Sequence, residues 1–338
     1  MNNTQRTLLA ALAIVGTSAA MAQSSVTLYG RVNTTVEQQK TGDTKVNGMF
    51  NNSSRWGVRG TEDLGGGLKA GFTLESGFAS DTGAAADTFF GRHSEVNLGG
   101  NFGMLRLGRF TADSYYATAD AISMHNHDTG SSADVLYTYV MRDSNKLGYR
   151  LPAFGGFTVD AAVSLSEKVP GEHNAFDLSA NYGAGPLGLG AGYTKNKGAA
   201  DVFGGGYAGE AQQVALRASY ALGAVNLGAY YQYVTLDDVN GTTADAKRHA
   251  YRLAAMYTMG ASELHANVGR AERIKLGGAK QAGTAANQWT LGYNYNLSKR
   301  TKVYGYYTKV DNGANISYRG GPAGADFTSV AVGVRHNF

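Results

Sequence analysis

The stretch VTLYGRVNTTV, residues 26–36, alternates between apolar and polar side chains. Most of its even-numbered positions hold Val or Leu, whereas its odd-numbered positions hold Thr, Tyr, Arg and Asn. Successive side chains of a β-strand point to opposite faces of the sheet. This period of two therefore predicts a strand that has one apolar face and one polar face.

The same alternation recurs along the rest of the chain. Short connections rich in turn residues, such as 63–67, alternate with much longer ones, such as 38–52 and 111–135. A single-chain bacterial barrel has an even number of strands, with short turns on one rim and long loops on the other. We predict about sixteen strands, at residues 25–37, 53–63, 67–78, 89–98, 104–110, 136–151, 157–165, 176–183, 187–194, 210–221, 225–235, 249–258, 263–270, 287–297, 302–310 and 327–338.

The alternation predicts an all-β fold, namely a transmembrane antiparallel β-barrel. A closed barrel leaves no strand edge unpaired, and one wider than about eight strands keeps an open lumen. A soluble two-sheet sandwich is the rival fold, and it would pack the inner faces of both sheets together. It would bury Arg31, Arg55 and Arg217 without partners, at a cost of several kcal/mol each, so we favour the barrel.

The first 22 residues have the features of a secretory signal peptide, with an apolar stretch and a small-residue ending at Ala20-Met21-Ala22. We expect cleavage there, which leaves residues 23–338 as one barrel domain. No later window holds the roughly 18 consecutive apolar residues of a membrane-spanning helix. The chain has no cysteine, and its net charge of +4 is too small and too dispersed to indicate nucleic-acid binding.

Three segments resemble a known family. They are VTLYGR at 26–31, SRWGVRGTEDLGGGLKA at 54–70 and GMLRLGR at 103–109, and they resemble Gram-negative general porins of the beta-proteobacterial and neisserial type. The terminal Phe338 is similar to the aromatic assembly signal of outer-membrane proteins. The resemblance implies a homotrimer in the lipid of the outer membrane. It also implies that a third loop, here 110–135, folds into each lumen.

Six arginines are candidates for a basic wall at the narrowest part of the lumen. Alternation places Arg31, Arg55, Arg59 and Arg106 on the polar face, and the resemblance assigns Arg31, Arg55 and Arg142 to the basic wall. Arg92 is in conflict, because the resemblance puts it on the wall whereas alternation with Val96 puts it on the outer face. A β-bulge between the two positions would reconcile these interpretations.

The opposing wall requires acids on the inward loop. Asp113, Asp120, Asp128 and Asp134 are available there, and we take Asp120 and Asp113 as the candidates, Asp120 first. The enteric form of this loop carries a Pro-Glu-Phe-Gly-Gly motif that this sequence lacks. The acidic positions therefore cannot be transferred residue by residue.

These features predict a general diffusion porin for ions and small hydrophilic solutes, with a modest preference for anions set by the arginines. The alternative is a substrate-specific channel that has a solute-binding site. An enzyme is disfavoured, since His93, His249 and His265 lie in no catalytic motif. No cofactor or metal is expected. The run HNHD at 125–128 could bind a metal, but a solvated loop explains it better.

Tyrosine-rich segments such as 230–233 and 304–307 allow two interpretations. They could form an aromatic track for sugars inside the lumen. We favour the other, a girdle of aromatic residues at the membrane interface.

Overall fold

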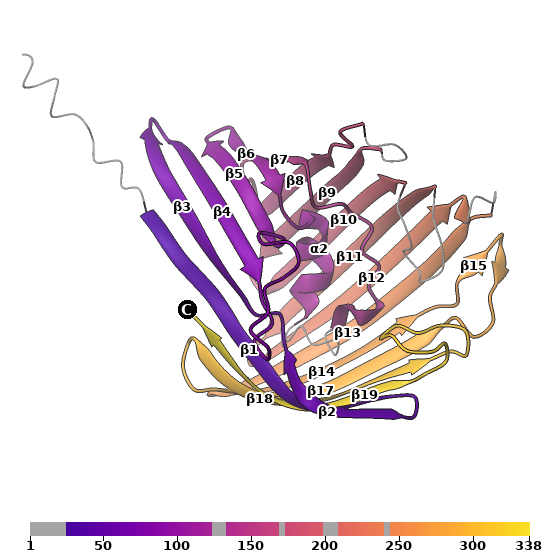
Figure 1. Cartoon of the computed structure of the whole chain (residues 1–338). Coiled ribbons are helices and arrows are strands. Elements are labelled where there is room, and N and C mark those ends of the chain that lie inside the picture. Colours follow the sequence, from indigo (N-terminus) through magenta and orange to yellow (C-terminus); the bar gives the residue numbers. More distant parts are fainter. Residues whose placement is uncertain (1–24, 124–132, 169–172, 199–208, 240–243) are drawn as a thin grey trace, which may run out of the picture.

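The computed structural model describes residues 25–123, 133–168, 173–198, 209–239 and 244–338. In these ranges the chain forms one antiparallel sheet of nineteen strands, and each barrel strand pairs with its neighbours along the sequence (Figure 1). Pairing of β1 with β19 closes the sheet into a barrel. The expected signal peptide lies outside the described residues.

Three of the nineteen strands, β2, β15 and β16, are additions within the connections, so sixteen strands make up the barrel wall. The prediction of a closed barrel of about sixteen strands is therefore confirmed. The strands are β1 (Ser25–Thr41), β2 (Thr44–Asn51), β3 (Arg55–Gly65), β4 (Leu68–Gly77), β5 (His93–Gly100), β6 (Gly103–Arg109), β7 (Lys146–Arg150), β8 (Phe157–Ser164), β9 (Ala175–Ala184), β10 (Leu187–Lys197), β11 (Glu210–Leu222), β12 (Val225–Asp237), β13 (Ala246–Met259), β14 (Ser262–Ala271), β15 (Lys275–Leu276), β16 (Ala279–Lys280), β17 (Ala286–Asn296), β18 (Thr301–Asn312) and β19 (Phe327–Asn337).

The barrel is apolar outside and polar inside, the reverse of a soluble protein. On β1 and β19 the outward Leu28 and Val332 are 61% and 66% exposed, whereas the inward Asn33 is fully buried. A surface of this kind is stable only against lipid, because exposing that much apolar area to water is unfavourable. No helix in the described ranges is long and apolar enough to cross a membrane.

The last residue of the chain meets the first strand near the rim that carries the short turns. The backbone of Phe338 exchanges two hydrogen bonds of 3.0 Å with that of Gly30, so the final residue extends the closing ladder. A Cβ atom on Gly30 would lie 2.4 Å from the ring of Phe338. A side chain at position 30 would therefore collide with the terminal ring.

Three predicted boundaries were wrong. The connection predicted at 38–52 is a hairpin, because β1 continues to Thr41 and pairs with β2. The strand predicted at 89–98 begins only at His93. The strand predicted at 136–151 is confined to β7, five residues long.

The last error has a physical cause. Leu136, Thr138 and Val140 are buried and alternate with less buried neighbours, as in a strand. Their segment, however, lies against the inner wall and does not belong to the sheet. The side chain of Gln232 accepts a hydrogen bond from the N–H of Thr138 at 3.1 Å and donates one to its carbonyl at 2.9 Å, in place of a neighbouring backbone. Alternation alone cannot distinguish a strand of the sheet from an extended segment that lies against its inner face.

Candidate functional site

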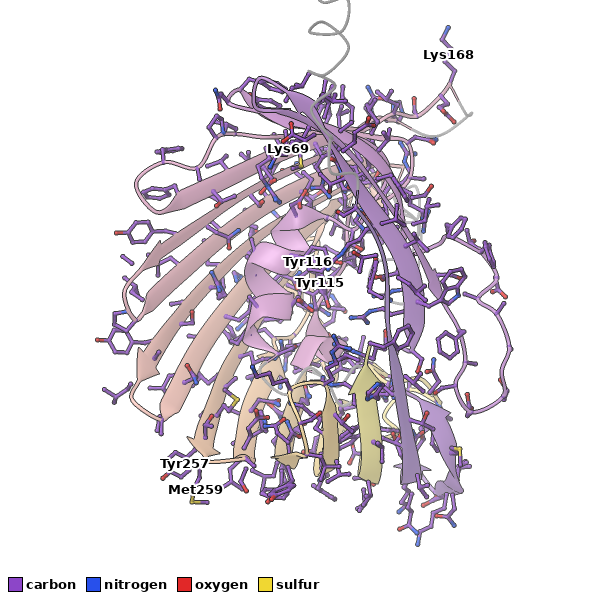
Figure 2. The ribbon with its side chains drawn as sticks, turned by 90° about the vertical axis from the view of Figure 1, so that its left-hand side faces the viewer. Lys69, Tyr115, Tyr116, Lys168, Tyr257 and Met259 are labelled. Atoms are coloured by element: carbon purple, nitrogen blue, oxygen red, sulfur yellow. The ribbon has the colours of Figure 1, made fainter. Side chains whose placement is uncertain are left out.

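The connection between β6 and β7 enters the barrel, as expected for an inward third loop. It contains the helical turn α2 (Asp113–Tyr115), the π-helical turn η1 (Tyr116–Asp120) and the 3-10 turn η2 (Ala133–Leu136). Figure 2 shows Tyr115 and Tyr116 on the helical segment inside the barrel, whereas Tyr257 and Met259 project from its outer edge. The segment contacts β9, β10 and β11 through α2 and η1, and β14 through η2.

Apolar contacts hold this inward loop on the wall formed by β9–β14 and β17. Four clusters join loop residues to inward-facing wall residues, and they contain Ala112, Met141 and Ala175; Ala119, Ile122, Ala215, Tyr230 and Ala254; Val140, Ala211, Val234, Leu236 and Ala246; and Leu136, Ala271 and Ala286. We call this part of the barrel the covered wall. Burial of these side chains gives the loop a fixed position instead of a solvated one.

Small inward residues make room for the loop. On β10, a Cβ atom at Gly190 would lie 2.0 Å from the carbonyl oxygen of Ala117, and one at Gly192 would lie 2.6 Å from the Cβ atom of Ser114. Real Cβ atoms do not approach other atoms so closely. The inward glycines of β10 are therefore a requirement for seating α2 and η1.

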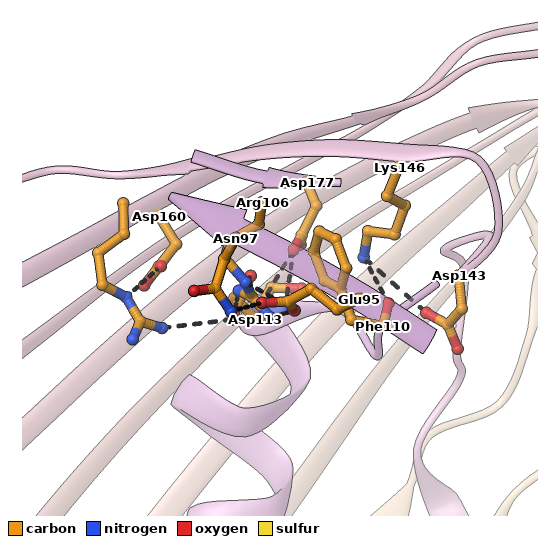
Figure 3. Close-up of polar contacts among 12 residues, drawn as sticks. Glu95, Asn97, Arg106, Phe110, Asp113, Asp143, Lys146, Asp160 and Asp177 are labelled. Carbon is orange, nitrogen blue, oxygen red and sulfur yellow. Dashed lines mark hydrogen bonds and ion pairs between the residues drawn. The ribbon is translucent and has the colours of Figure 1, made fainter. Parts of the chain in front are cut away.

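A buried ionic cluster fixes the base of the loop (Figure 3). Arg106, on the inner face of β6, donates to Glu95 at 2.8 Å and to both carboxylate oxygens of Asp113 at 2.9 Å. All three side chains are nearly buried. Nη1 makes both contacts to Asp113, whereas Nε and Nη2 bond Glu95, so one guanidinium joins the two carboxylates. We call Glu95, Arg106 and Asp113 the anchor cluster.

Further contacts extend the anchor cluster. Asp177 accepts the backbone N–H groups of Asp113 at 2.8 Å and Ser114 at 3.4 Å, which would otherwise be unpaired at the start of α2. Arg150 lies 2.6 Å from Asp160 and 3.6 Å from Asp113. Asp113 is therefore held between two arginines, each of which also pairs with a second carboxylate.

Phe110 begins the loop and is fully buried between two cations. The guanidinium carbon of Arg106 lies 4.0 Å from the ring centroid, and the ammonium of Lys146 lies 4.5 Å from it. Lys146 also donates to the carbonyl of Phe110 at 3.0 Å. This arrangement ties the first residue of the loop to the strand that follows the loop.

The arginines predicted on β1 and β3 lie together on the inner face. Arg31 and Arg55 are register partners, and Arg59 lies further along the inner face of β3, with its guanidinium carbon 5.0 Å from the ring centroid of Tyr29. Glu75 on β4 is 3.8 Å from Arg55 and 2.6 Å from Arg92. We call Arg31, Arg55, Arg59 and Arg92 the basic wall.

The position of Arg92 resolves the conflict between alternation and resemblance. Arg92 lies one residue before β5, so it is outside the alternating ladder. The pairing of β4 with β5 runs without a register shift, and no bulge is needed. The side chain of Arg92 turns to Glu75 on the inner face of β4.

Arg142 and Asp120 lie elsewhere. Arg142 donates to the carbonyls of Ser164 at 3.2 Å and His173 at 3.0 Å, near the end of β8, and is not brought together with Arg31 and Arg55. Asp120 ends η1 and is partly exposed. Asp128 falls outside the described residues, as does the HNHD run.

Tyr116, which the sequence did not single out, lies on the same turn as Asp120. The residue is 46% exposed, yet its partial burial raises its pKa, and the charges of Arg92, Asp120 and Glu75 also act on its hydroxyl. This turn of the inward loop therefore lies within electrostatic range of the basic wall.

Two further cations beside the basic wall were missed. Arg335 of β19 lies beside Asn33 of β1 on the inner face, and Lys302 of β18 is its register partner. Alternation could have found Arg335, because Val332 and Val334 on the same strand are exposed on the outer face. Together with the basic wall, these residues give one side of the lumen a run of positive charge.

The tyrosine-rich segments divide between the two faces. Tyr304 and Tyr306 are almost fully buried inside and donate hydrogen bonds to Asn33 at 2.7 Å and Glu37 at 2.8 Å. Tyr307 packs against Trp289. The girdle interpretation was therefore wrong for Tyr304 and Tyr306. Within the described ranges, no group of three or more acidic or histidine side chains could hold a metal ion.

Comparisons with known proteins agree with this geometry. A family model described as Gram-negative porin matches residues 8–315. Outer membrane porin protein 32 of Delftia acidovorans is 36% identical over 375 residues, which cover 99% of this chain and all of the relative. An outer membrane porin protein of Bordetella pertussis is 30% identical over 399 residues, which cover 99% of this chain and all of that relative.

Solved structures give the same result. An anion-selective porin from Comamonas acidovorans superimposes with a TM-score of 0.79 and 30% identity, covering 94% of this chain and all of that one. OmpT of Vibrio cholerae, with a TM-score of 0.70 and 19% identity over 93% of this chain and 98% of that one, shares the fold. The chain belongs to the Gram-negative porin family. It is a channel protein of the outer membrane, not an enzyme, and lets small hydrophilic solutes diffuse through its lumen.

Proposed function

We propose that this porin favours anions, and that the basic wall sets the preference. The observation that carries the proposal is an asymmetry of charge. Asp113, the acid at the base of the inward loop, is nearly buried in ion pairs with Arg106 and Arg150, which also pair with Glu95 and Asp160. On the basic wall, in contrast, Arg55 and Arg92 share the carboxylate of Glu75, and Arg31 is the register partner of Arg55.

An excess of fixed positive charge in a narrow, partly desolvated passage concentrates anions and repels cations. Asp120 on the inward loop is opposite in charge to the basic wall, so a transverse field crosses the passage. The anion selectivity of the similar Comamonas acidovorans porin supports the same direction of preference. Arg142 would act at the mouth of the passage, near the end of β8.

The proposal includes two features of the whole protein. Residues 1–22 serve as a cleaved signal peptide for export, and three copies of the barrel associate in the outer membrane. The apolar stretch and small-residue ending of the first 22 residues support the first feature, and the family resemblance supports the second. N-terminal sequencing of the mature protein would test the first, and the mass of the detergent-solubilised protein, corrected for bound detergent, would test the second.

The zero-current potential across a KCl gradient in a planar bilayer tests the selectivity. We expect a chloride-favouring potential for the wild type and a weaker one for Arg31→Gln and Arg55→Gln. Arg270→Gln is the matched control, because Arg270 is an exposed arginine bonded to Asn287 outside the lumen. A potassium-favouring wild type would contradict the proposal, as would variants in the basic wall that leave the potential unchanged.

A further inference from the structure

Loop 313–326 at the mouth of the barrel and the inward loop meet at one side chain, Arg248 of β13. Arg248 is 3% exposed on the inner face of the wall. Its Nη1 donates to the hydroxyl of Tyr318 at 2.6 Å, and its guanidinium carbon lies 5.2 Å from the centroid of that ring. Its Nη2 donates to the carbonyl of Leu136 at 3.0 Å and to the hydroxyl of Thr138.

Both partners of Arg248 are themselves held in place. Tyr318 packs against the buried cluster that contains Leu136, so the two loops also share an apolar contact. At the mouth, the N–H of Tyr318 donates to Asn312 at 3.1 Å, and the N–H of Gly313 donates to the carbonyl of Ala285 at 2.8 Å. Loop 313–326 is thus an ordered segment.

We propose that Arg248 is a positioning residue that couples loop 313–326 to the inward loop, so that displacement of the outer loop changes the width of the passage. The guanidinium is planar and its donors have fixed directions, so one Arg248 geometry serves both loops. Moving Tyr318 away removes an acceptor from a buried cation, which then loses its best position for Leu136 and Thr138. This coupling is separate from charge selectivity.

The test is the current through single channels of the full-length protein in a planar bilayer. Tyr318→Phe removes only the hydroxyl and keeps the ring that packs against the Leu136 cluster. We expect the fraction of time spent outside the main conductance level to rise about tenfold, which corresponds to ~1.4 kcal/mol. Tyr307→Phe is the matched control, because Tyr307 packs against Trp289 away from both loops.

A double variant separates coupling from simple anchoring. If Arg248 joins the loops, Tyr318→Phe adds little to Arg248→Gln, and Arg248→Lys restores part of the wild-type behaviour. Tyr318→Phe that behaves like the wild type would overturn the proposal, whatever Arg248→Gln does, since Arg248 would then hold the inward loop alone. Additive effects of the two changes would also overturn it. The zero-current potential should stay chloride-favouring in all of these variants.

Discussion

The covered wall and the basic wall are two sides of one barrel, built from strands with the same alternation of apolar and polar residues. The inner face of the covered wall carries many small or uncharged residues where the loop lies, such as Gly190, Ala215 and Gln232, and its charged Asp177 and Arg248 bond to the loop itself. The inner face of the basic wall carries Arg31 and Arg55. The period of two decides which face is inside, and residue size and charge decide what that face does.

Removing the anchor cluster should disturb the inward loop on the covered wall more than any other change. Arg106→Gln leaves Glu95 and Asp113 buried without their shared cation, although Arg150 still lies near Asp113. Breaking a buried ion pair from one side typically costs about 3–5 kcal/mol. We expect a lower urea midpoint for unfolding in lipid and a larger, less steady conductance. Wild-type values for both measurements would show that the loop does not depend on Arg106.

A smaller effect is expected from filling the space under the loop. Gly190→Ala places a Cβ atom against the carbonyl of Ala117, so the inward loop must shift, at about 1–3 kcal/mol. We expect an altered single-channel conductance. Gly183→Ala is the matched control, since a Cβ at Gly183 on the neighbouring strand would meet nothing within 4 Å. Equal conductance in both variants would mean that the loop does not rest on β10.

The smallest effect is expected from Gln232, whose side chain bonds Thr138 in the part of the loop that leads to β7. Gln232→Leu removes both hydrogen bonds to Thr138 and leaves its backbone groups unpaired, at about 1–3 kcal/mol for a buried group. We expect noisier currents with an unchanged zero-current potential, because Gln232 carries no charge. A changed potential would place this region of the covered wall in the passage.

The sequence was sufficient for the barrel, the inward loop and most of the basic wall. Alternation alone places Arg31, Arg55 and Arg59 on the inner face, because each lies inside a regular strand. Alternation predicted the wrong face for Arg92, because this residue lies outside the hydrogen-bonded ladder. It also predicted a strand over residues 136–141, where the chain is extended but does not join the sheet. It also could not show that Asp113 is ion-paired, since Arg106 and Arg150 reach it from β6 and β7.

Part of what was missed left a signal in the sequence. Inward glycines such as Gly190 and Gly192 are unfavourable in a strand, and they indicate that another part of the chain approaches closely. Alternation along β19 also places Arg335 on the inner face. The contacts of Arg248 with Tyr318 and Leu136, in contrast, depend on how two loops fold, and no local pattern predicts them.

Accessibility of single cysteines tests the central claim most directly, namely that solutes pass along the basic wall and not behind the inward loop. The chain has no cysteine, so each substitution introduces the only thiol. Arg59→Cys places it at an exposed inward position, and Gln213→Cys places it at a position that is 1% exposed on the covered wall. We expect an anionic thiosulfonate reagent to reduce the current of Arg59→Cys rapidly and to leave that of Gln213→Cys unchanged. Rapid block of Gln213→Cys with no effect on Arg59→Cys would contradict the account.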